Sequence, residues 1–396
     1  MSIARPRLLF VSNLFPDAAE PYRGLDNATL LHHLAGQYEI RVLSPRPTLP
    51  GGSGKIHRCR EMDTRFAPVY FPAPYIPKIG SRFNHRLMAG ALGPALTALQ
   101  REFPFDVVLS SWVYPDGCAV ARVAREMHFP FAVIAQGSDV HQYLKIPARR
   151  KIIVESMQSA FAIITRSGEL GRLLHTAGLA EEKLHTVYNG IDFSIFQPGD
   201  SQKARRELGL SPDAPLILFV GNFLPVKNPL FLVKAHAAFC RLHPESKCRL
   251  LMIGGGPMES EIRAEARRNG FGDQVQIVGR KNSNEVANYM TAADFLCLPS
   301  VNEGVPNVIL ESFATGLRVI ASRVGGIPEV LNHDFLGRLV EPGNLADLLQ
   351  AFTSLFAESP VIDTIRNHAL YFSWERAASE YSILLKKAAA QPRLRI

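Results

Sequence analysis

Short apolar runs alternate with longer amphipathic segments through the first half of the chain. The runs lie at residues 7–13, 39–43, 107–109, 131–135 and 162–164, and the amphipathic segments lie near 26–36, 84–102, 117–127, 147–159 and 168–176. A short, continuously apolar run followed by a helical period is typical of a buried parallel strand and its crossover helix. The pattern predicts a doubly wound α/β domain.

The same pattern starts again in the second half. A charged helix opens at Asp200-Ser201, residues 216–220 form a new first strand, and further strands are expected at 249–253, 275–278 and 318–321. The stretch Gln197-Pro198-Gly199-Asp200 is suited to a linker. The sequence therefore predicts an α/β fold of two Rossmann-like domains. We expect the carboxyl ends of their strands to face a central cleft that takes a ligand.

Two acids eight residues apart mark the most informative loop, which runs from Val301 to Glu311. Residues 293–300 indicate a buried strand, and Pro306 suits a first helical position, so Glu303 should lie in the loop and Glu311 in the helix. A helix rises about 1.5 Å per residue, which puts the two carboxylates on the order of 10 Å apart. Unpaired amides at the helix start would favour an anion such as a diphosphate. The alternative is a pair of solvated acids in a first turn.

Composition narrows the class of protein. The chain has 396 residues, 47% of them apolar, which suits two or three soluble domains. It contains no apolar run long enough to span a bilayer and no signal-peptide pattern at its start, so we expect it in the cytoplasm. Its five cysteines contain no C-x-x-C pair, which favours reduced thiols over a zinc site or a disulfide framework.

Positive charge is concentrated between Arg41 and Arg101. This segment holds ten Lys or Arg and two acidic residues, an excess equal to the net charge of +8 of the whole chain. Proline and aromatic residues are interleaved with these charges, for example in 71–78. Basic residues beside apolar anchors suit an anionic membrane surface, and an ordinary solvated loop is the alternative. Nucleic acid is not expected, because no nucleic-acid-binding motif accompanies the charge.

Several motifs resemble the retaining glycosyltransferase family GT4, which has the two-domain GT-B fold. In chain order they are Asn189-Gly190-Ile191-Asp192, Phe219-Val220-Gly221-Asn222 with Lys227, 251–257 (LMIGGGP), Glu303-x7-Glu311 and 324–329 (VGGIPE). In the first half, 111–117 (SWVYPDG) and Gly137-Ser138-Asp139 resemble the branch of bacterial surface-polysaccharide transferases similar to the teichuronic acid enzymes. The resemblance implies an acceptor-binding domain at 1–196, completed by a last helix at 374–396, and a donor-binding domain at 197–373.

The resemblance also implies roles for individual residues. Lys227 would contact the diphosphate of a UDP- or GDP-sugar, Glu303 would hold hydroxyls of the transferred sugar, and Glu311 would accept from the ribose. These are metal-independent roles in a hexosyltransferase, in which cations and amides neutralise the leaving group. The expected donor-binding set is Gly24, Asn222, Lys227, Gly254, Arg280, Glu303, Gly304, Val305, Pro306, Asn307, Val308 and Glu311.

Two positions depart from the family pattern. Asn222 stands where the family usually has Arg, which removes one phosphate contact that Arg280 or Lys281 would have to supply. Gln136 stands where many relatives have a His near the transferred sugar, so we expect it to bind a sugar hydroxyl rather than to move a proton. The resemblance places Gly137 and Asp139 on the acceptor side.

Other classes of protein fit less well. A nicotinamide dehydrogenase would want G-x-G-x-x-G after a strand, and a metal-dependent transferase would want D-x-D, and the chain has neither. A nucleotide-sugar epimerase of similar fold and an inactive polysaccharide-binding relative remain alternatives. The expected function is transfer of a sugar to a glycan or lipid-linked acceptor in cell-surface polysaccharide synthesis, in the cytoplasm or at the inner face of the membrane. No cofactor and no metal are expected. The sugar, base, acceptor, linkage and oligomeric state stay open.

Overall fold

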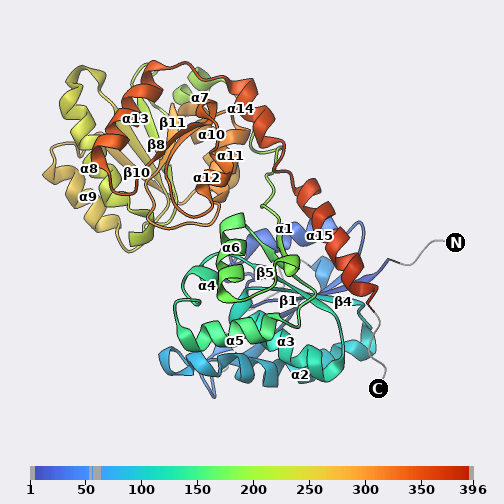
Figure 1. Cartoon of the computed structure of the whole chain (residues 1–396). Coiled ribbons are helices and arrows are strands. Elements are labelled where there is room, and N and C mark those ends of the chain that lie inside the picture. The colour runs from blue at the N-terminus through green and yellow to red at the C-terminus, as the bar shows by residue number, and fades with distance from the viewer. Residues whose placement is uncertain (1–4, 53–55, 57–63, 392–396) are drawn as a thin grey trace. The chain divides into compact units, whose positions relative to one another are not determined.

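The chain folds into two compact units. The computed structural model describes residues 5–52, 56 and 64–391 (Figure 1). The first unit runs to Asn189 and resumes at Trp374, and the second spans Gly190–Ser373. The sequence placed the boundary after Phe196. The chain changes unit earlier because Asn189 Nδ2 donates to Asp26 in the first unit, whereas the Ile191 amide donates to Phe372 O in the second.

A seven-stranded parallel sheet forms the centre of the first unit, in the order β3-β2-β1-β4-β5-β6-β7. Its strands are β1 (Arg7–Val11), β2 (Glu39–Thr48), β3 (Val69–Pro74), β4 (Val107–Ser111), β5 (Phe131–Ala135), β6 (Ala162–Thr165) and β7 (Leu184–Thr186). Its helices are α1 (Leu25–Leu34), α2 (Asn84–Glu102), α3 (Cys118–Met127), α4 (Ser138–His141), α5 (Pro147–Met157), α6 (Gly168–Ala177) and α15 (Trp374–Ala389).

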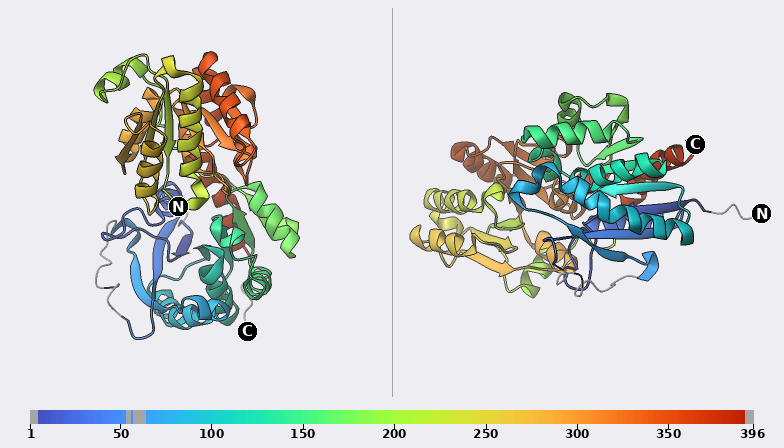
Figure 2. Two further views of the ribbon diagram at one scale, coloured as in Figure 1. Left: turned by 90° about the vertical axis from the view of Figure 1, so that its left-hand side faces the viewer. Right: turned by 90° about the horizontal axis from the view of Figure 1, so that it is seen from below.

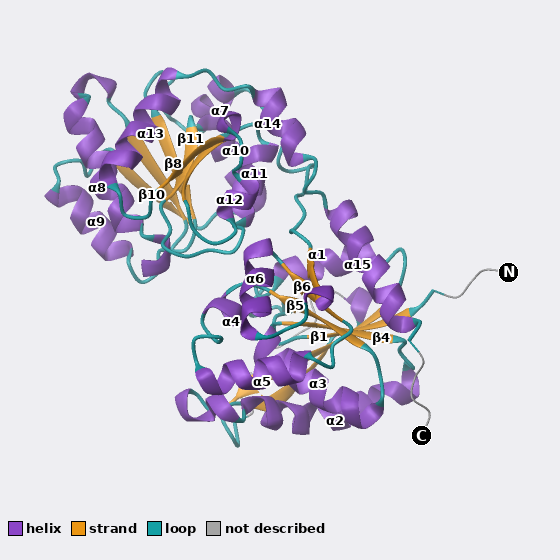
Figure 3. Ribbon diagram, viewed as in Figure 1, coloured by secondary structure: helices purple, strands orange, loops and turns teal. Residues whose placement is uncertain are grey.

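Helices cover both faces of this sheet (Figure 3). Alternate residues of β1 enter two separate cores: Leu9 packs with residues of α2, α3 and α5, and Phe10 packs with residues of α1 and α15. This is why the predicted strands read as continuous apolar runs rather than as alternating ones. The last helix, α15, contributes the buried Trp374 and Tyr381 to the first unit, although it follows the whole second unit in the sequence.

The second unit has a six-stranded parallel sheet in the order β10-β9-β8-β11-β12-β13. Figure 2 shows the helices on both sides of its strands. The strands are β8 (Leu216–Val220), β9 (Arg249–Ile253), β10 (Val275–Gly279), β11 (Phe295–Leu298), β12 (Arg318–Ser322) and β13 (Gly337–Val340). The helices are α7 (Ser201–Glu207), α8 (Pro229–Leu242), α9 (Glu259–Arg268), α10 (Ser283–Ala292), α11 (Asn307–Ala314), α12 (Ile327–Val330), α13 (Leu345–Ala357) and α14 (Ile362–Ala369).

The described part of the basic, proline-rich segment contains regular secondary structure. β2 extends to Thr48, and Phe71–Pro74 belong to the edge strand β3, where prolines are tolerated because one side of the strand needs no donors. Arg46 is buried in β2 and adds nothing to the exposed positive charge. Lys55, Arg58 and Arg60 lie outside the described residues.

Each sheet has one point at which its strand order reverses. In the first unit β1 lies between β2 and β4, and in the second β8 lies between β9 and β11. Loops that leave the carboxyl ends of the two central strands diverge there, and such switch points are where open α/β sheets bind ligands. The predicted residues Lys227 and Glu303 follow β8 and β11 respectively.

Candidate donor and acceptor sites

The switch point of the second unit brings Lys227 and Glu303 together. Lys227 ends the short helix η6 (Pro225–Lys227) after β8, and its Nζ lies 2.5 Å from Glu303 Oε1. The lysine side chain keeps 22% of its exposure and the glutamate 11%. The sequence predicted that both contact the donor, and the structure joins them directly although they are 76 residues apart.

Local hydrogen bonds fix this pair. The Val301 amide donates to Val226 O at 2.8 Å, which ties the loop after β11 to the turn that carries Lys227. Ser300 Oγ donates to Glu303 Oε1 at 2.7 Å, so one carboxylate oxygen receives both a hydroxyl and an ammonium. Charge-assisted bonds of this kind are about twice as strong as neutral ones. The pair is therefore a partly exposed, preorganised charge cluster.

The helix after this loop begins one residue later than predicted. Pro306 has extended backbone angles and precedes α11, so Asn307 rather than Pro306 is the first helical residue. The reason is that ψ of Pro306 is 126°, outside the helical range. Residues 304–308 still form the loop and first helical turn and are all half-buried. Glu311 lies in α11 and is also half-buried, as its predicted contact with a ligand requires.

Glycines allow neighbouring loops to pack against this site. Gly325 has a φ of 55°, and a Cβ there would lie 1.7 Å from Glu303 O. Gly254 has a φ of 139°, and a Cβ there would lie 1.9 Å from Gly221 O. Both positions need a residue without a side chain. The VGGIPE and GGGP motifs therefore support the loops that follow β11 and β8.

The remaining predicted donor-side residues of the second unit lie at the same edge of its sheet. Asn222 is exposed in the loop after β8, five residues before Lys227. Arg280 is exposed after β10, and its Nε lies 3.6 Å from where a Cβ of Gly255 would be, so it flanks the GGGP turn. Lys281 is paired with Glu285 at 2.9 Å.

In the first unit, Gly24 and Gln136 are linked through Asn27. Gly24 precedes α1 with a left-handed φ of 64°, and a Cβ there would lie 2.2 Å from Leu14 O. Asn27 Nδ2 donates to the same Leu14 carbonyl at 2.8 Å. Gln136 Nε2 donates to Asn27 Oδ1 at 2.9 Å and to Ser111 Oγ at 2.7 Å. Gln136 therefore already makes two bonds as a donor.

Asp139 is fully buried and holds backbone rather than facing solvent. Its carboxylate accepts from the amides of Val113, Gln136 and Gly137 at 2.8, 3.0 and 2.8 Å. Burial raises the pKa of Asp139, and these three bonds oppose the shift. An acceptor role for Asp139 stays a prediction, and in this geometry it would act by fixing the loop that carries Gly137.

Sequence reasoning missed the polar pair at the switch point of the first unit. Asp116 is fully buried, and it accepts from Asn13 twice, from the backbone amide at 2.5 Å and from Nδ2 at 2.7 Å. Burial raises the pKa of Asp116 to about 7, although the bonds from Asn13 lower it. The only signal in the sequence was an acid within the SWVYPDG motif, which does not identify a partner 103 residues away.

A cavity of about 200 Å³ lies elsewhere in the second unit. Asp294, Arg318 and Glu358 line it, before β11 and at the start of β12, so it is at the amino edge of the sheet. Arg318 already donates to the carbonyls of Leu355 and Glu358. The cavity is therefore at the opposite edge of the sheet from Lys227 and Glu303.

Metal-binding clusters and membrane-spanning helices are both absent from the residues that the structure describes. Among those residues, no group of three or more His, Cys, Asp or Glu side chains is placed to hold a metal ion. No helix among them has the length and apolar character needed to cross a bilayer.

Comparison with known families assigns both units. Residues 27–195 match the model for Glycosyltransferase Family 4, and residues 200–369 match the model for Glycosyl transferases group 1. The chain belongs to the GT4-type glycosyltransferases. Its two parallel-sheet units are the two domains of the GT-B fold, as the sequence predicted.

Individual proteins give the same picture. The D-inositol 3-phosphate glycosyltransferase of Saccharomonospora viridis is 28% identical over 270 residues, 65% of this chain and 62% of that protein. The chain spans about half to three fifths of the length of the curated relatives it matches. Sucrose-phosphate synthase from Thermosynechococcus elongatus has a TM-score of 0.78 at 21% identity, over 97% of this chain and 99% of that one. Anabaena Alr3699/HepE in complex with UDP has a TM-score of 0.75 at 18% identity, over 96% and 100%.

Proposed function

We propose that this protein transfers a sugar from a nucleotide sugar to a hydroxyl group of an acceptor, with retention at the anomeric carbon and without a metal ion. The Lys227–Glu303 pair at the switch point of the second sheet carries the proposal. Lys227 would neutralise the diphosphate as its charge develops, and the amides after Gly304 would bind its oxygens. Family membership and the order of the matching motifs support these roles.

The ion pair suggests how the donor is received. Lys227 is held by Glu303 in the structure, so an incoming diphosphate competes for the ammonium. Once the ammonium turns to the phosphate, the Glu303 carboxylate is released to accept hydroxyls of the transferred sugar. Glu311, on the following helix, would accept from the ribose. One ion pair thus holds both side chains in place before the donor binds, with Lys227 ready for the diphosphate and Glu303 for the sugar.

A UDP-sugar is the preferred donor in this proposal. Alr3699/HepE, which shares the fold, has been solved with UDP-glucose. We propose a cell-surface glycan or its lipid-linked precursor as the acceptor, on the basis of the motifs in the first half. The relatives named D-inositol 3-phosphate glycosyltransferase make a phosphorylated cyclitol the second candidate.

Release of free nucleotide from a panel of UDP- and GDP-sugars, with and without each acceptor class, tests the proposal. Acceptor-dependent release that persists in excess EDTA supports it, and activity that is lost in EDTA and restored by magnesium contradicts metal independence. Conversion of the donor to an isomer without an acceptor would show an epimerase instead. Absence of both turnover and UDP binding would leave an inactive relative.

Glu311→Ala sharpens the donor assignment. Loss of a charged hydrogen bond to ribose costs about 1.5–3 kcal/mol, so the Kd for UDP should rise by about tenfold or more. The measurement is calorimetric titration with UDP. An unchanged Kd would remove Glu311 from the site.

We also propose that the first unit docks on an anionic membrane surface. Lys78, Arg82 and Arg86 are exposed on η3 (Lys78–Arg82) and the first turn of α2, and Phe83 between them is 38% exposed. Each basic residue near an anionic surface contributes on the order of 1 kcal/mol, so three give reversible binding. Arg46 is not part of this surface, because it is buried.

Co-sedimentation with phosphatidylglycerol vesicles and with neutral vesicles tests this docking. Changing Lys78, Arg82 and Arg86 to Glu should abolish the preference for anionic vesicles. The matched control changes Arg263, Arg267 and Arg268 of α9 to Glu, since they are also exposed and the net charge falls equally. Equal loss in both variants would show a general charge effect rather than docking through this surface.

A further inference from the structure

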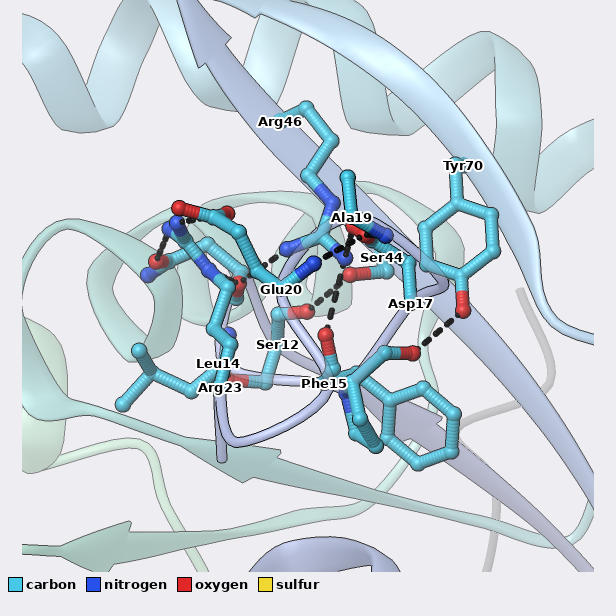
Figure 4. Close-up of polar contacts among 12 residues, drawn as sticks. Ser12, Leu14, Phe15, Asp17, Ala19, Glu20, Arg23, Ser44, Arg46 and Tyr70 are labelled. Atoms are coloured by element: carbon cyan, nitrogen blue, oxygen red, sulfur yellow. Dashed lines mark hydrogen bonds and ion pairs between the residues drawn. The ribbon is translucent and has the colours of Figure 1, made fainter. Parts of the chain in front are cut away.

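A buried ion pair sits beneath the loop that joins β1 to α1. Arg46 of β2 and Asp17 of the loop are 2.6 Å apart, and their side chains are only 4% and 1% exposed (Figure 4). Burying two charges is costly, and apolar residues of similar volume often give equal or greater stability. The pair therefore calls for an explanation other than stability, and its contacts supply one.

The Arg46 guanidinium donates hydrogen bonds to three residues of the loop. Nη1 donates to Asn13 O at 3.0 Å, and Nη2 donates to Phe15 O at 2.8 Å as well as to Asp17 Oδ2. The guanidinium also lies 4.8 Å from the ring centre of Tyr70, whose hydroxyl donates to Pro16 O at 2.6 Å. Every residue from 13 to 17 except Leu14 is thereby held through its carbonyl or carboxylate by Arg46 or Tyr70.

The bonds continue to the end of the loop. The second oxygen of Asp17 accepts from the amides of Ala19 and Glu20 at 2.8 and 2.9 Å. Arg23 Nε donates back to Asn13 O at 2.8 Å, so Asn13 O receives both arginines. The loop therefore closes on itself just before Gly24.

Two predicted site residues of the first unit, Gly24 and Gln136, depend on this closed loop. Leu14 O accepts from Asn27 and leaves no room for a side chain on Gly24. Asn27 in turn accepts from Gln136. A shift of the loop at Leu14 would move Gly24, Asn27 and Gln136 together. Arg46 itself is 3% exposed and cannot reach a substrate.

We propose that Arg46 is a positioning residue that presets the β1–α1 loop for substrate binding. The proposal rests on the proposed function, because it takes Gly24 and Gln136 as substrate-binding residues. Asp17 holds the guanidinium in place, and Tyr70 holds the loop from the other side. The planar fork of Arg supplies donors in several directions from one fixed group, which the single ammonium of Lys cannot copy.

Arg46→Lys tests the proposal against a matched control, Arg205→Lys. Arg205 is also buried, with 5% exposure, and its guanidinium is paired with Asp294 at 3.1 Å. It donates to the carbonyls of Ala292, Pro212 and Ala214. It lies in α7 and binds loops at the amino edge of the second sheet, away from the candidate site. Both variants should lower the unfolding temperature to a similar extent.

The two variants should differ in kinetics. Loss of charged hydrogen bonds that position the loop should lower kcat/KM for the sugar nucleotide by about tenfold or more in Arg46→Lys, while Arg205→Lys keeps the parent value. Tyr70→Phe, which removes one bond and no charge, should change kcat/KM in the same direction by a smaller factor. Parent kinetics in Arg46→Lys, at an equal loss of stability, would make Arg46 merely structural and overturn the proposal.

Trypsin cleavage after Arg23 gives a readout that does not require activity. The closed loop should protect this bond in the parent and in Arg205→Lys, and cleavage should be faster by about tenfold in Arg46→Lys if opening of the loop controls it. If the parent turns over no sugar nucleotide, the proposed function fails, but the cleavage rates still decide whether Arg46 orders the loop. Equal cleavage in all three proteins would overturn the proposal on its own.

Discussion

The two sheets have the same kind of switch point but use its charges differently. In the second unit, the loops after β8 and β11 carry Lys227 and Glu303, which are paired yet remain 22% and 11% exposed. In the first unit, the loops after β1 and β4 are joined by Asn13 and Asp116, and the Asp116 carboxylate is fully buried. The second sheet thus leaves its charged pair partly exposed to solvent, and the first buries its acidic group.

This difference predicts a ligand-binding role for the exposed pair and a structural role for the buried one. An accessible ion pair can be exchanged for an ion pair with a ligand, because the ligand replaces a partner that was already charged. A buried carboxylate that accepts two bonds from one asparagine has no such exchange open to it, and it fixes the backbone instead. We therefore expect substitutions in the second unit to change catalysis most, and those in the first to act through loop position and stability.

Lys227→Ala should have the largest effect. Loss of the positive charge opposite the leaving group should lower kcat by about 10²–10³-fold, the range seen when one donor to a developing charge is removed. Glu303→Ala should also lower kcat more than it weakens UDP binding. Steady-state kinetics and UDP titration measure the two quantities separately.

Lys203→Ala is the control for this pair. Lys203 is an exposed lysine of α7 whose Nζ lies 3.9 Å from Glu207, so its removal also breaks a lysine–glutamate contact. Its kinetics should equal those of the parent. If Lys227→Ala and Lys203→Ala behave alike, the switch point of the second unit is not the donor site.

Gly325→Ala should have the next largest effect. Its Cβ would collide with Glu303 O, so Glu303 must move and kcat/KM should fall by about tenfold or more. Gly343→Ala is matched in backbone strain, since Gly343 has a φ of 74° and open space around it, and strain alone costs of order 1–3 kcal/mol of stability. The measurement is kcat/KM of the two variants at equal stability. Equal values would show that the loop at Glu303 accommodates the added Cβ without loss of activity.

Asp116→Asn should destabilise the first unit with little direct effect on catalysis. The new amide group would point a donor at Asn13, leaving a buried donor unsatisfied at a cost of about 1–3 kcal/mol. Adding Asn13→Asp should recover most of this loss, because the acceptor and donor are then exchanged between the two positions. Urea unfolding of the parent, the single and the double variant measures the free energy of unfolding. If the double variant is no more stable than Asp116→Asn, the pairing of residues 13 and 116 is not the source of the lost stability.

The pH dependence of stability concerns only the free energy of unfolding and no catalytic step. Burial holds the pKa of Asp116 at about 7, above its ordinary value of 3.8, so the folded state retains a proton that the unfolded state has lost between those pH values. Stability should therefore fall as pH rises from about 4 to about 7, by up to about 1.4 kcal/mol per unit, and level off above. Asp116→Asn should lack this component, and identical slopes in both proteins would contradict it.

The places in the fold of most residues of the candidate donor site could be predicted from the sequence. Glu303, Lys227 and the glycine turns lie in loops directly after strands, and Glu311 lies in the helix that follows one of these loops. Parallel strands carry such loops to one edge of a sheet. The contact between Lys227 and Glu303 could not be predicted, since the two residues come from different loops. The predicted start of α11 was wrong by one residue, because proline suits both the first helical position and the extended position before it.

The sequence by itself determined the two parallel sheets and the edge of each sheet at which the candidate site residues lie. Both follow from local properties of the chain, namely the apolar periodicity and the succession of strands, loops and helices. Only the tertiary structure decided which charges are available. Arg46 belonged to a basic segment by composition, yet folding pairs it with Asp17 and removes it from the surface. Asp116 meets Asn13 only because β1 and β4 are neighbours. Burial and pairing depend on residues brought together from distant parts of the chain, and these set whether a charge binds a ligand or holds the fold.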